Sequence, residues 1–133
     1  MTNKSKKILT EISAGELLDK ISILEIKIDK IKDKSDLNEI RKERKILTEV
    51  KDAQIESSDE IEKLFNNLKK INLNLWNIED KIRHCEKNKD FNQTFIDLAR
   101  NVYLNNDKRA EIKSKINKKL NSNIKEIKQY VNY

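Results

Sequence analysis

A short stretch of the sequence, from Asn72 to Arg83, concentrates side chains that could bind or transform a small molecule. Asn72, Trp76, Glu79 and Arg83 follow one another at intervals of four, three and four, and Asp80 lies one turn beyond Trp76. On an α-helix, residues three and four apart share a face. The only tryptophan of the chain, an acidic pair and an arginine are therefore expected on one side of a helix.

A second polar group follows on the next predicted helix, where Arg100, Tyr103 and Asp107 are spaced three and four apart. If the two helices fold back about residue 89, antiparallel packing places three pairs of residues at the same level along the helix axes. These pairs are Glu79 with Arg100, Trp76 with Tyr103, and Asn72 with Asp107. The two groups together form a candidate polar groove: Asn72, Trp76, Glu79, Asp80, Arg83, Arg100, Tyr103 and Asp107.

Two interpretations of this groove stay open. Carboxylates held near arginines and aromatic rings could bind an anionic small molecule or position a proton donor. The same residues could instead close on one another, with a Glu79–Arg100 ion pair fixing the register and Trp76 stacked on Tyr103. We favour the second, structural interpretation, and the sequence assigns no catalytic residue.

Residue counts exclude several kinds of site. One glycine cannot build a glycine-rich phosphate loop, and one histidine with one cysteine cannot build the usual zinc site or an internal disulfide. His84 and Cys85 are adjacent, so they point about 100° apart on a helix, which disfavours a catalytic pair. Acidic pairs such as Glu16 and Asp19 have no matched second set, so we predict no metal and no cofactor.

The elements that carry these residues are predicted to be helices. The chain has no proline, one glycine, and apolar seams at intervals of three and four, the longest from Ile61 to Cys85. Polar residues followed three positions later by Glu or Gln predict helix starts at Ser13, Asp36, Ser57 and Asp90. The expected helices cover residues 13–31, 37–56, 59–87 and 91–131, and a break or bend at residues 105–107 is left open.

Short connections between long helices favour antiparallel neighbours. We therefore predict an all-α fold: an elongated antiparallel helical bundle, or coiled-coil hairpins, of about four helices with little or no sheet. Residues 1–12 are expected to form an extended N-terminal segment, and residues 13–133 a single helical-bundle domain. Only 36% of the residues are hydrophobic, so the apolar seam is thin, and a homo-oligomer or a complex with a protein partner is expected.

Charge is unevenly distributed along the chain. The formal net charge is +6, and eight basic residues lie between Lys108 and Lys128 against Glu111 and Glu126. Such a stretch could bind nucleic-acid phosphates. Because lysine far outnumbers arginine and the basic positions spread around the predicted helix, we favour a solvated surface over nucleic-acid binding.

No apolar run is long enough for a membrane span or a signal peptide, and a cytoplasmic protein is expected.

Three segments of the chain carry a resemblance: Ile12–Lys27, Leu75–Arg83 and Ala99–Ala110. In their order and spacing they resemble a family of short, all-helical bacterial and phage proteins catalogued as a domain of unknown function. The resemblance implies that the three segments belong to one arrangement. It also implies that the protein is encoded near glycosyltransferase or surface-polysaccharide genes. The family has no catalytic residues that could be assigned to this chain.

The leading functional prediction is a non-enzymatic helical protein that works by self-association or partner binding, as an accessory to surface-polysaccharide or nucleotide-sugar metabolism. One alternative is a small-molecule-binding or catalytic helical bundle that acts on an anionic, sugar-related ligand through the candidate polar groove. A second alternative is nucleic-acid binding through the basic C-terminal helix. Whether the protein is an enzyme is left open.

Overall fold

Each helix of the computed structural model, which describes residues 6–133, begins where a polar side chain accepts a hydrogen bond from the first turn. Ser13 Oγ accepts from the Glu16 N–H at 3.1 Å, as predicted. The other three caps differ from the predicted ones: Asp33 replaces Asp36, Ser58 replaces Ser57, and Asn92 replaces Asp90. The helices are α1 (Ala14–Lys30), α2 (Lys34–Gln54), α3 (Asp59–Asn88) and α4 (Gln93–Lys119).

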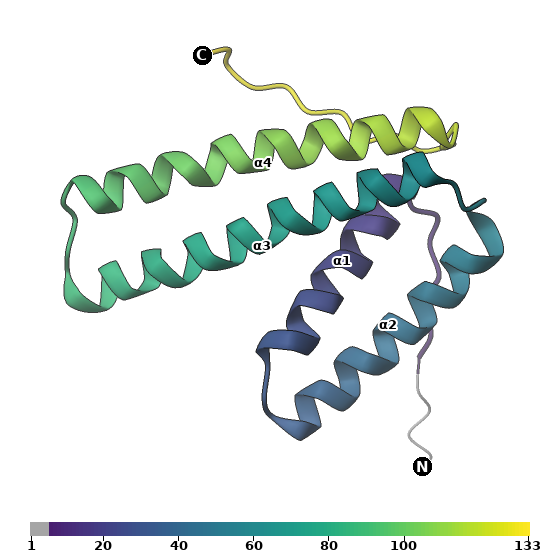
Figure 1. Cartoon of the computed structure of the whole chain (residues 1–133), viewed down its shortest axis with the longest axis horizontal. Coiled ribbons are helices and arrows are strands. Elements are labelled where there is room, and N and C mark those ends of the chain that lie inside the picture. Colours follow the sequence, from purple (N-terminus) through teal and green to yellow (C-terminus); the bar gives the residue numbers. More distant parts are fainter. Residues whose placement is uncertain (1–5) are drawn as a thin grey trace.

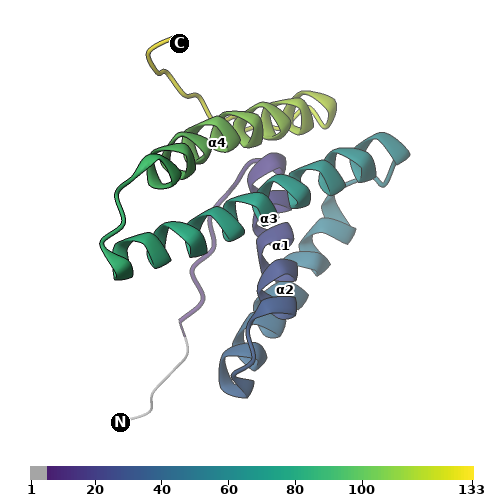
Figure 2. The same ribbon diagram turned by 60° about the vertical axis from the view of Figure 1, so that its left-hand side comes forward.

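The four helices form two antiparallel hairpins that cross (Figures 1 and 2). α3 and α4 lie side by side as one long hairpin, and α1 with α2 forms the second. α1 packs against each of the other helices, whereas the α2 backbone approaches only that of α1. Residues 6–133 contain no strand, so the all-α prediction is confirmed.

The apolar core lies where α1 meets the α3–α4 hairpin. Leu18 of α1, Ile61 and Leu68 of α3, and Ile116 of α4 form one buried cluster. α1 is the most deeply buried helix, with Leu17, Leu18, Ile21, Leu24 and Ile26 inside, while α2 buries no residue. α2 thus lies at the periphery, and the centre of the fold is the first helix.

The last helix ends earlier than predicted. The seam through Ile127 and Val131 predicted a helix to Val131, but α4 stops at Lys119 and no helix follows in residues 120–133. Asn121 has a left-handed conformation (φ 49°), and the Ser122 N–H bonds back to the Asn117 carbonyl at 2.8 Å. This is a Schellman-type helix end. The prediction of a helix to Val131 was wrong because an Asn-terminated turn outcompetes a seam that nothing covers: Ile127 and Val131 are each 89% exposed.

α4 runs without a break through residues 105–107, although Asn and Asp side chains can compete for backbone hydrogen bonds. Asn105 Nδ2 donates to the Asn101 carbonyl at 2.8 Å, and Asp107 accepts from the Tyr133 hydroxyl.

The N-terminal segment carries no helix or strand in residues 6–13. The remainder of the extended segment predicted for residues 1–12 lies outside the described residues. The assignment of residues 13–133 to a single domain stays a prediction. None of the helices in residues 6–133 has the length and apolar character needed to cross a membrane.

Candidate functional site

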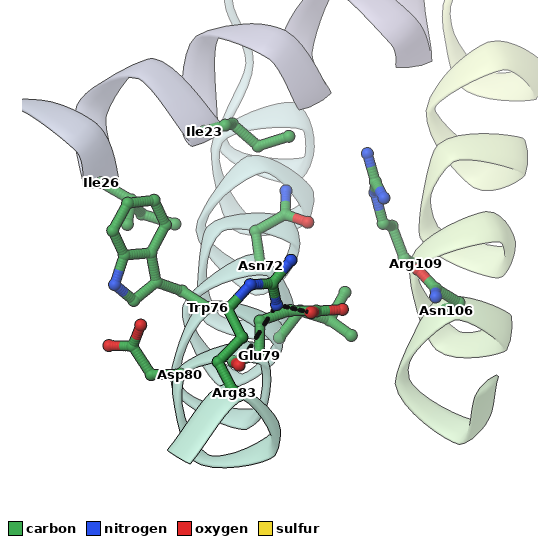
Figure 3. Close-up of a pocket in the computed structure, with 10 residues that line it drawn as sticks. Ile23, Ile26, Asn72, Trp76, Glu79, Asp80, Arg83, Asn106 and Arg109 are labelled. Atoms are coloured by element: carbon green, nitrogen blue, oxygen red, sulfur yellow. Dashed lines mark hydrogen bonds and ion pairs between the residues drawn. The ribbon is translucent and has the colours of Figure 1, made fainter. Parts of the chain in front are cut away.

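The cavity of interest opens where α1 leaves the α3–α4 hairpin, and its volume is ≈ 460 Å³. Helices α1, α3 and α4 all contribute side chains to it (Figure 3). A volume of this size suits a small ligand, since such pockets commonly measure roughly 300–1,000 Å³. The lining residues are Ile23, Ile26, Asn72, Leu75, Trp76, Glu79, Asp80, Arg83, Asn106 and Arg109.

The structure brings together the α3 half of the predicted polar groove. Asn72, Trp76, Glu79, Asp80 and Arg83 all line the cavity. Their spacing along one helix is sufficient to predict this, because the α-helical period alone decides which of them share a face.

The α4 half of the predicted groove lies elsewhere. Tyr103 stacks edge-to-face on Tyr133 of the C-terminal tail, with ring centroids 5.6 Å apart, and Asp107 accepts from the same tyrosine. Arg100 is exposed and does not line the cavity. Asn106 and Arg109 take their place. Lys119 of α4 pairs with Glu60 of α3 at 2.8 Å, close to the pairing that a fold about residue 89 predicts. The face that α4 turns toward the cavity, however, differs from the predicted one.

The ion pair at the cavity mouth forms within α3. Glu79 pairs with Arg83 one turn later, and both side chains are substantially exposed, at 48% and 71%. Among residues 6–133 there is no Glu79–Arg100 ion pair. Because both residues belong to α3, the Glu79–Arg83 pair cannot fix the register of the two helices, and exposed pairs of this kind contribute little stability.

A buried polar network missed by the sequence analysis forms the floor of the cavity. Asp19 on α1, 1% exposed, receives hydrogen bonds from Arg109 Nε and from Asn72 Nδ2, each at 2.9 Å, and a further bond from the other end of the Arg109 guanidinium. Asn72 Nδ2 also donates to Ser22 Oγ at 2.8 Å. One carboxylate thereby joins α1, α3 and α4.

The electrostatics of this network favour the charged forms of both partners. Burial raises the pKa of Asp19, but the hydrogen bonds from Arg109 and Asn72 and the charges of Arg109 and Lys113 outweigh it, so the net pKa lies below the ordinary value. The hydrogen bond to Asp19 raises the pKa of Arg109. The pair therefore stays ionised across the physiological range.

A signal for Asp19 exists in the sequence. The segment from Leu17 to Ile26 is apolar on most sides of its helix, and a helix that is apolar nearly all round is buried. A carboxylate inside it needs a basic partner, because an unpaired buried charge is costly. The identity of that partner is not encoded locally, since Arg109 lies 90 residues away.

A second polar junction joins α1 to α4 and to the C-terminal tail. Lys113, 6% exposed, donates to Glu16 of α1 and pairs with Glu126 of the tail, each at 2.8 Å. Burial lowers the pKa of Lys113, but these hydrogen bonds raise it more. The hydrogen bond from Lys113 holds the pKa of Glu126 below its ordinary value. The tail is thus anchored to the helices by this ion pair as well as by the contact of Tyr133 with Tyr103.

Backbones of α1 and α4 approach closely at this junction. The Gly15 N–H donates to Asn117 Oδ1 at 2.7 Å, and a Cβ at Gly15 would lie 2.7 Å from the Lys113 carbonyl oxygen. The one glycine of the chain therefore stands where another residue would collide with a neighbouring backbone.

Comparison with known proteins identifies a family and no relative of known activity. A family model described as a family of unknown function, DUF6165, matches residues 8–133. Comparison with curated proteins found no match, and comparison with solved structures found none either.

Proposed function

The chain belongs to the family of unknown function DUF6165, and from this premise we propose that it is a non-enzymatic protein that works by self-association. The associating surface is the far end of the α3–α4 hairpin, residues 73–104, called the α3–α4 arm below. In this proposal two copies pack their arms together and so complete an apolar core that one copy leaves open.

The observation that carries the proposal is the lack of burial along the arm. No residue from 73 to 104 is buried, although Asn72 and Asn105 at its two ends are. The arm nevertheless holds many large apolar side chains, all half-buried or exposed: Leu73, Leu75, Trp76, Ile78, Ile82, Phe91, Phe95, Ile96, Leu98, Val102, Tyr103 and Leu104. Apolar groups clustered on an exposed surface are typical of interaction sites.

One stripe of the arm lies outside the contact between its own two helices. Ile96, Ala99 and Tyr103 follow at intervals of three and four on α4. Ile96 is 46% exposed, and Tyr103 is 45% exposed although Tyr133 of the tail packs on it. The arm projects beyond α1 and α2 in both views (Figures 1 and 2), so these helices leave it open to a second copy.

The size of the arm sets the expected strength of the dimer. Sixteen residues of helix rise about 24 Å, and two helices side by side are about 20 Å wide, so two arms could cover on the order of 1,000 Å² in total. This is below the roughly 1,200–2,000 Å² of stable specific interfaces and is typical of weak, transient ones. A reversible dimer that dissociates on dilution is therefore expected.

The wider role proposed for this dimer is that of an accessory protein in surface-polysaccharide or nucleotide-sugar metabolism. What supports this part is the resemblance described above, which points to neighbouring genes of that class. The protein would act there by holding partners together rather than by chemistry of its own.

Nucleic-acid binding is less well supported than self-association. Of the eight basic residues between positions 108 and 128, five have acidic partners: Arg109, Lys113, Lys115, Lys119 and Lys128. Paired cations attract phosphates less strongly, because their field is already partly neutralised. The stretch is also divided between α4 and the non-helical tail.

Replacing Ile96 with glutamate is expected to weaken the dimer at least 10-fold. In a two-fold symmetric dimer the substitution occurs twice, and each copy places a charge in an apolar contact. Sedimentation velocity over a concentration series measures the effect. The wild-type protein should shift from monomer to dimer as its concentration rises, whereas Ile96→Glu should remain monomeric over most of that range.

Ile46→Glu is the matched control, since Ile46 on α2 is 51% exposed and receives the same change far from the arm. This variant should dimerise like the wild-type protein, and circular dichroism should show that both variants are as helical as the wild type. A wild-type chain that stays monomeric at every concentration would overturn the proposal, as would equal loss of dimer in the two variants.

A further inference from the structure

The cavity between α1, α3 and α4 has a chemical character that self-association does not explain. One wall is apolar and comes from Ile23 and Ile26 of α1 and from Leu75 and Trp76 of α3. The floor is rigid, because Asn72 and Arg109 are both held by the buried Asp19. A fixed floor beside an apolar wall favours a ligand that enters without rearranging the helices.

The charges that line the cavity leave one carboxylate uncompensated. Arg109 is engaged by Asp19, and Arg83 is engaged by Glu79. Asp80 has no ion-pair or hydrogen-bond partner within residues 6–133. Both guanidinium groups are therefore already neutralised, and the remaining charge in the cavity is negative.

Hydrogen-bond acceptors are also available at the floor. Both hydrogen bonds of the Asn72 side chain use its nitrogen, Nδ2. Figure 3 shows its amide oxygen turned toward α4 and Arg109, on the side away from Trp76 and Asp80. This oxygen can accept a hydrogen bond from a polar group of a ligand, while the Asp80 carboxylate favours a positively charged donor.

Trp76 completes a site for a cation. Asp80 follows it by one helical turn, and Figure 3 shows the Asp80 carboxylate next to the edge of the indole ring. Cations bind over aromatic faces, best over tryptophan, and a neighbouring carboxylate adds a direct charge interaction. We propose that this cavity binds a small organic cation, an ammonium group on an apolar frame, over the face of the Trp76 ring and beside the Asp80 carboxylate.

This proposal argues against the anionic, sugar-related ligand considered from the sequence. An anion would have to displace Asp19 from Arg109 or Glu79 from Arg83, and it would lie near the uncompensated charge of Asp80. An organic cation needs neither displacement. The ligand class therefore follows from which charges are already paired.

Choline is a suitable probe, because Trp76 is the only tryptophan and its fluorescence reports on the cavity directly. Choline chloride, titrated against the full chain at constant ionic strength, is expected to change the emission saturably in the millimolar range. Its neutral isostere, 3,3-dimethyl-1-butanol, should bind at least 10-fold more weakly because it has the same shape without the charge. Free N-acetyl-tryptophanamide measures collisional quenching.

Asp80→Asn should weaken choline binding at least 10-fold while leaving the shape of the cavity unchanged. Glu86→Gln is the matched control, since Glu86 lies on the same helix, outside the cavity, and should bind choline as the wild type does. Equal binding of choline and its neutral isostere would overturn the proposal. So would a purely collisional response, unchanged binding by Asp80→Asn, or saturable binding of inorganic phosphate in place of choline. Because Trp76 and Asp80 belong to the α3–α4 arm, each titration is repeated in the Ile96→Glu background, where the protein is monomeric and the outcome does not depend on the dimer.

Discussion

Asp19→Ala is expected to lower the free energy of unfolding by about 3–5 kcal/mol. The side chain of Asp19 is 2% exposed, and its loss leaves the Arg109 guanidinium partly buried, at 29% exposure, without a counter-charge. Asn72 also loses an acceptor. Breaking one half of a buried ion pair costs more than the pair itself contributes, because the remaining charge stays desolvated. Urea denaturation followed by circular dichroism measures the change.

Glu25→Ala is the matched control on the same helix. Glu25 bonds to Lys69 at 3.1 Å and to Arg44 at 3.3 Å, but its side chain is 21% exposed, so its loss should cost at most about 1 kcal/mol. A double variant, Asp19→Ala with Arg109→Leu, should recover part of the lost stability because no unpaired charge remains. The account of the network fails if Asp19→Ala costs no more than Glu25→Ala.

The Asp19 network also predicts how stability depends on pH. The pKa of Asp19 is lower in the folded protein than its ordinary value of 3.8, so the folded state binds its proton less readily than the unfolded chain. Its stabilisation is therefore fully present above about pH 4 and is lost as the pH falls through the folded value. In urea titrations below pH 4, the wild-type protein should lose more stability than Asp19→Asn, which has no carboxyl group to protonate.

The second large effect is expected at Gly15, where even a methyl group should destabilise the protein. Helix propensity alone predicts that Gly15→Ala stabilises α1 by up to about 1 kcal/mol. The added Cβ, however, would lie 2.7 Å from the Lys113 backbone oxygen and 3.0 Å from Asn117 Oδ1. Because a backbone atom cannot move aside alone, α1 must shift away from α4 and lose its bond to Asn117. We expect Gly15→Ala to cost about 1–2 kcal/mol and Gly15→Val about 3 kcal/mol.

Ser35→Val tests whether this effect is specific. Ser35 is the second residue of α2, as Gly15 is of α1, but it is exposed. The change there should alter thermal stability by no more than about 0.5 kcal/mol. A neutral or stabilising Gly15→Ala would show that the close approach of α1 and α4 is not required.

The sequence predicts the helices well where the signal is local. Ser13 caps α1 as expected, and α3 was predicted to span residues 59–87 and spans Asp59–Asn88. Capping residues and apolar periodicity act within a turn or two, so they can be recognised without knowledge of the rest of the chain. The error at the C-terminus has the same origin: the apolar spacing continues beyond Leu120, but Ile127 and Val131 stay exposed and Asn121 ends the helix.

The candidate site could be predicted only in part. The α3 half follows from spacing along one helix, whereas the α4 half depends on how α4 is rotated about its axis. That rotation follows from long-range contacts, in which Ile116 enters the core and Arg109 turns toward Asp19. An antiparallel alignment of two helices predicts which residues lie at the same level along the helix axes. It does not predict how α1 packs against them, and that packing decides which face of α4 points inward.

Hydrogen exchange at two protein concentrations tests the central claim, self-association through the α3–α4 arm, most directly. A two-helix arm without a covering partner opens easily, because few apolar contacts resist opening. At high concentration, amides of residues 73–104 should exchange more slowly than at low concentration, while those of α1 and α2 should exchange equally in both. Protection that does not change with concentration, or that changes in α2 instead of the arm, would contradict the account.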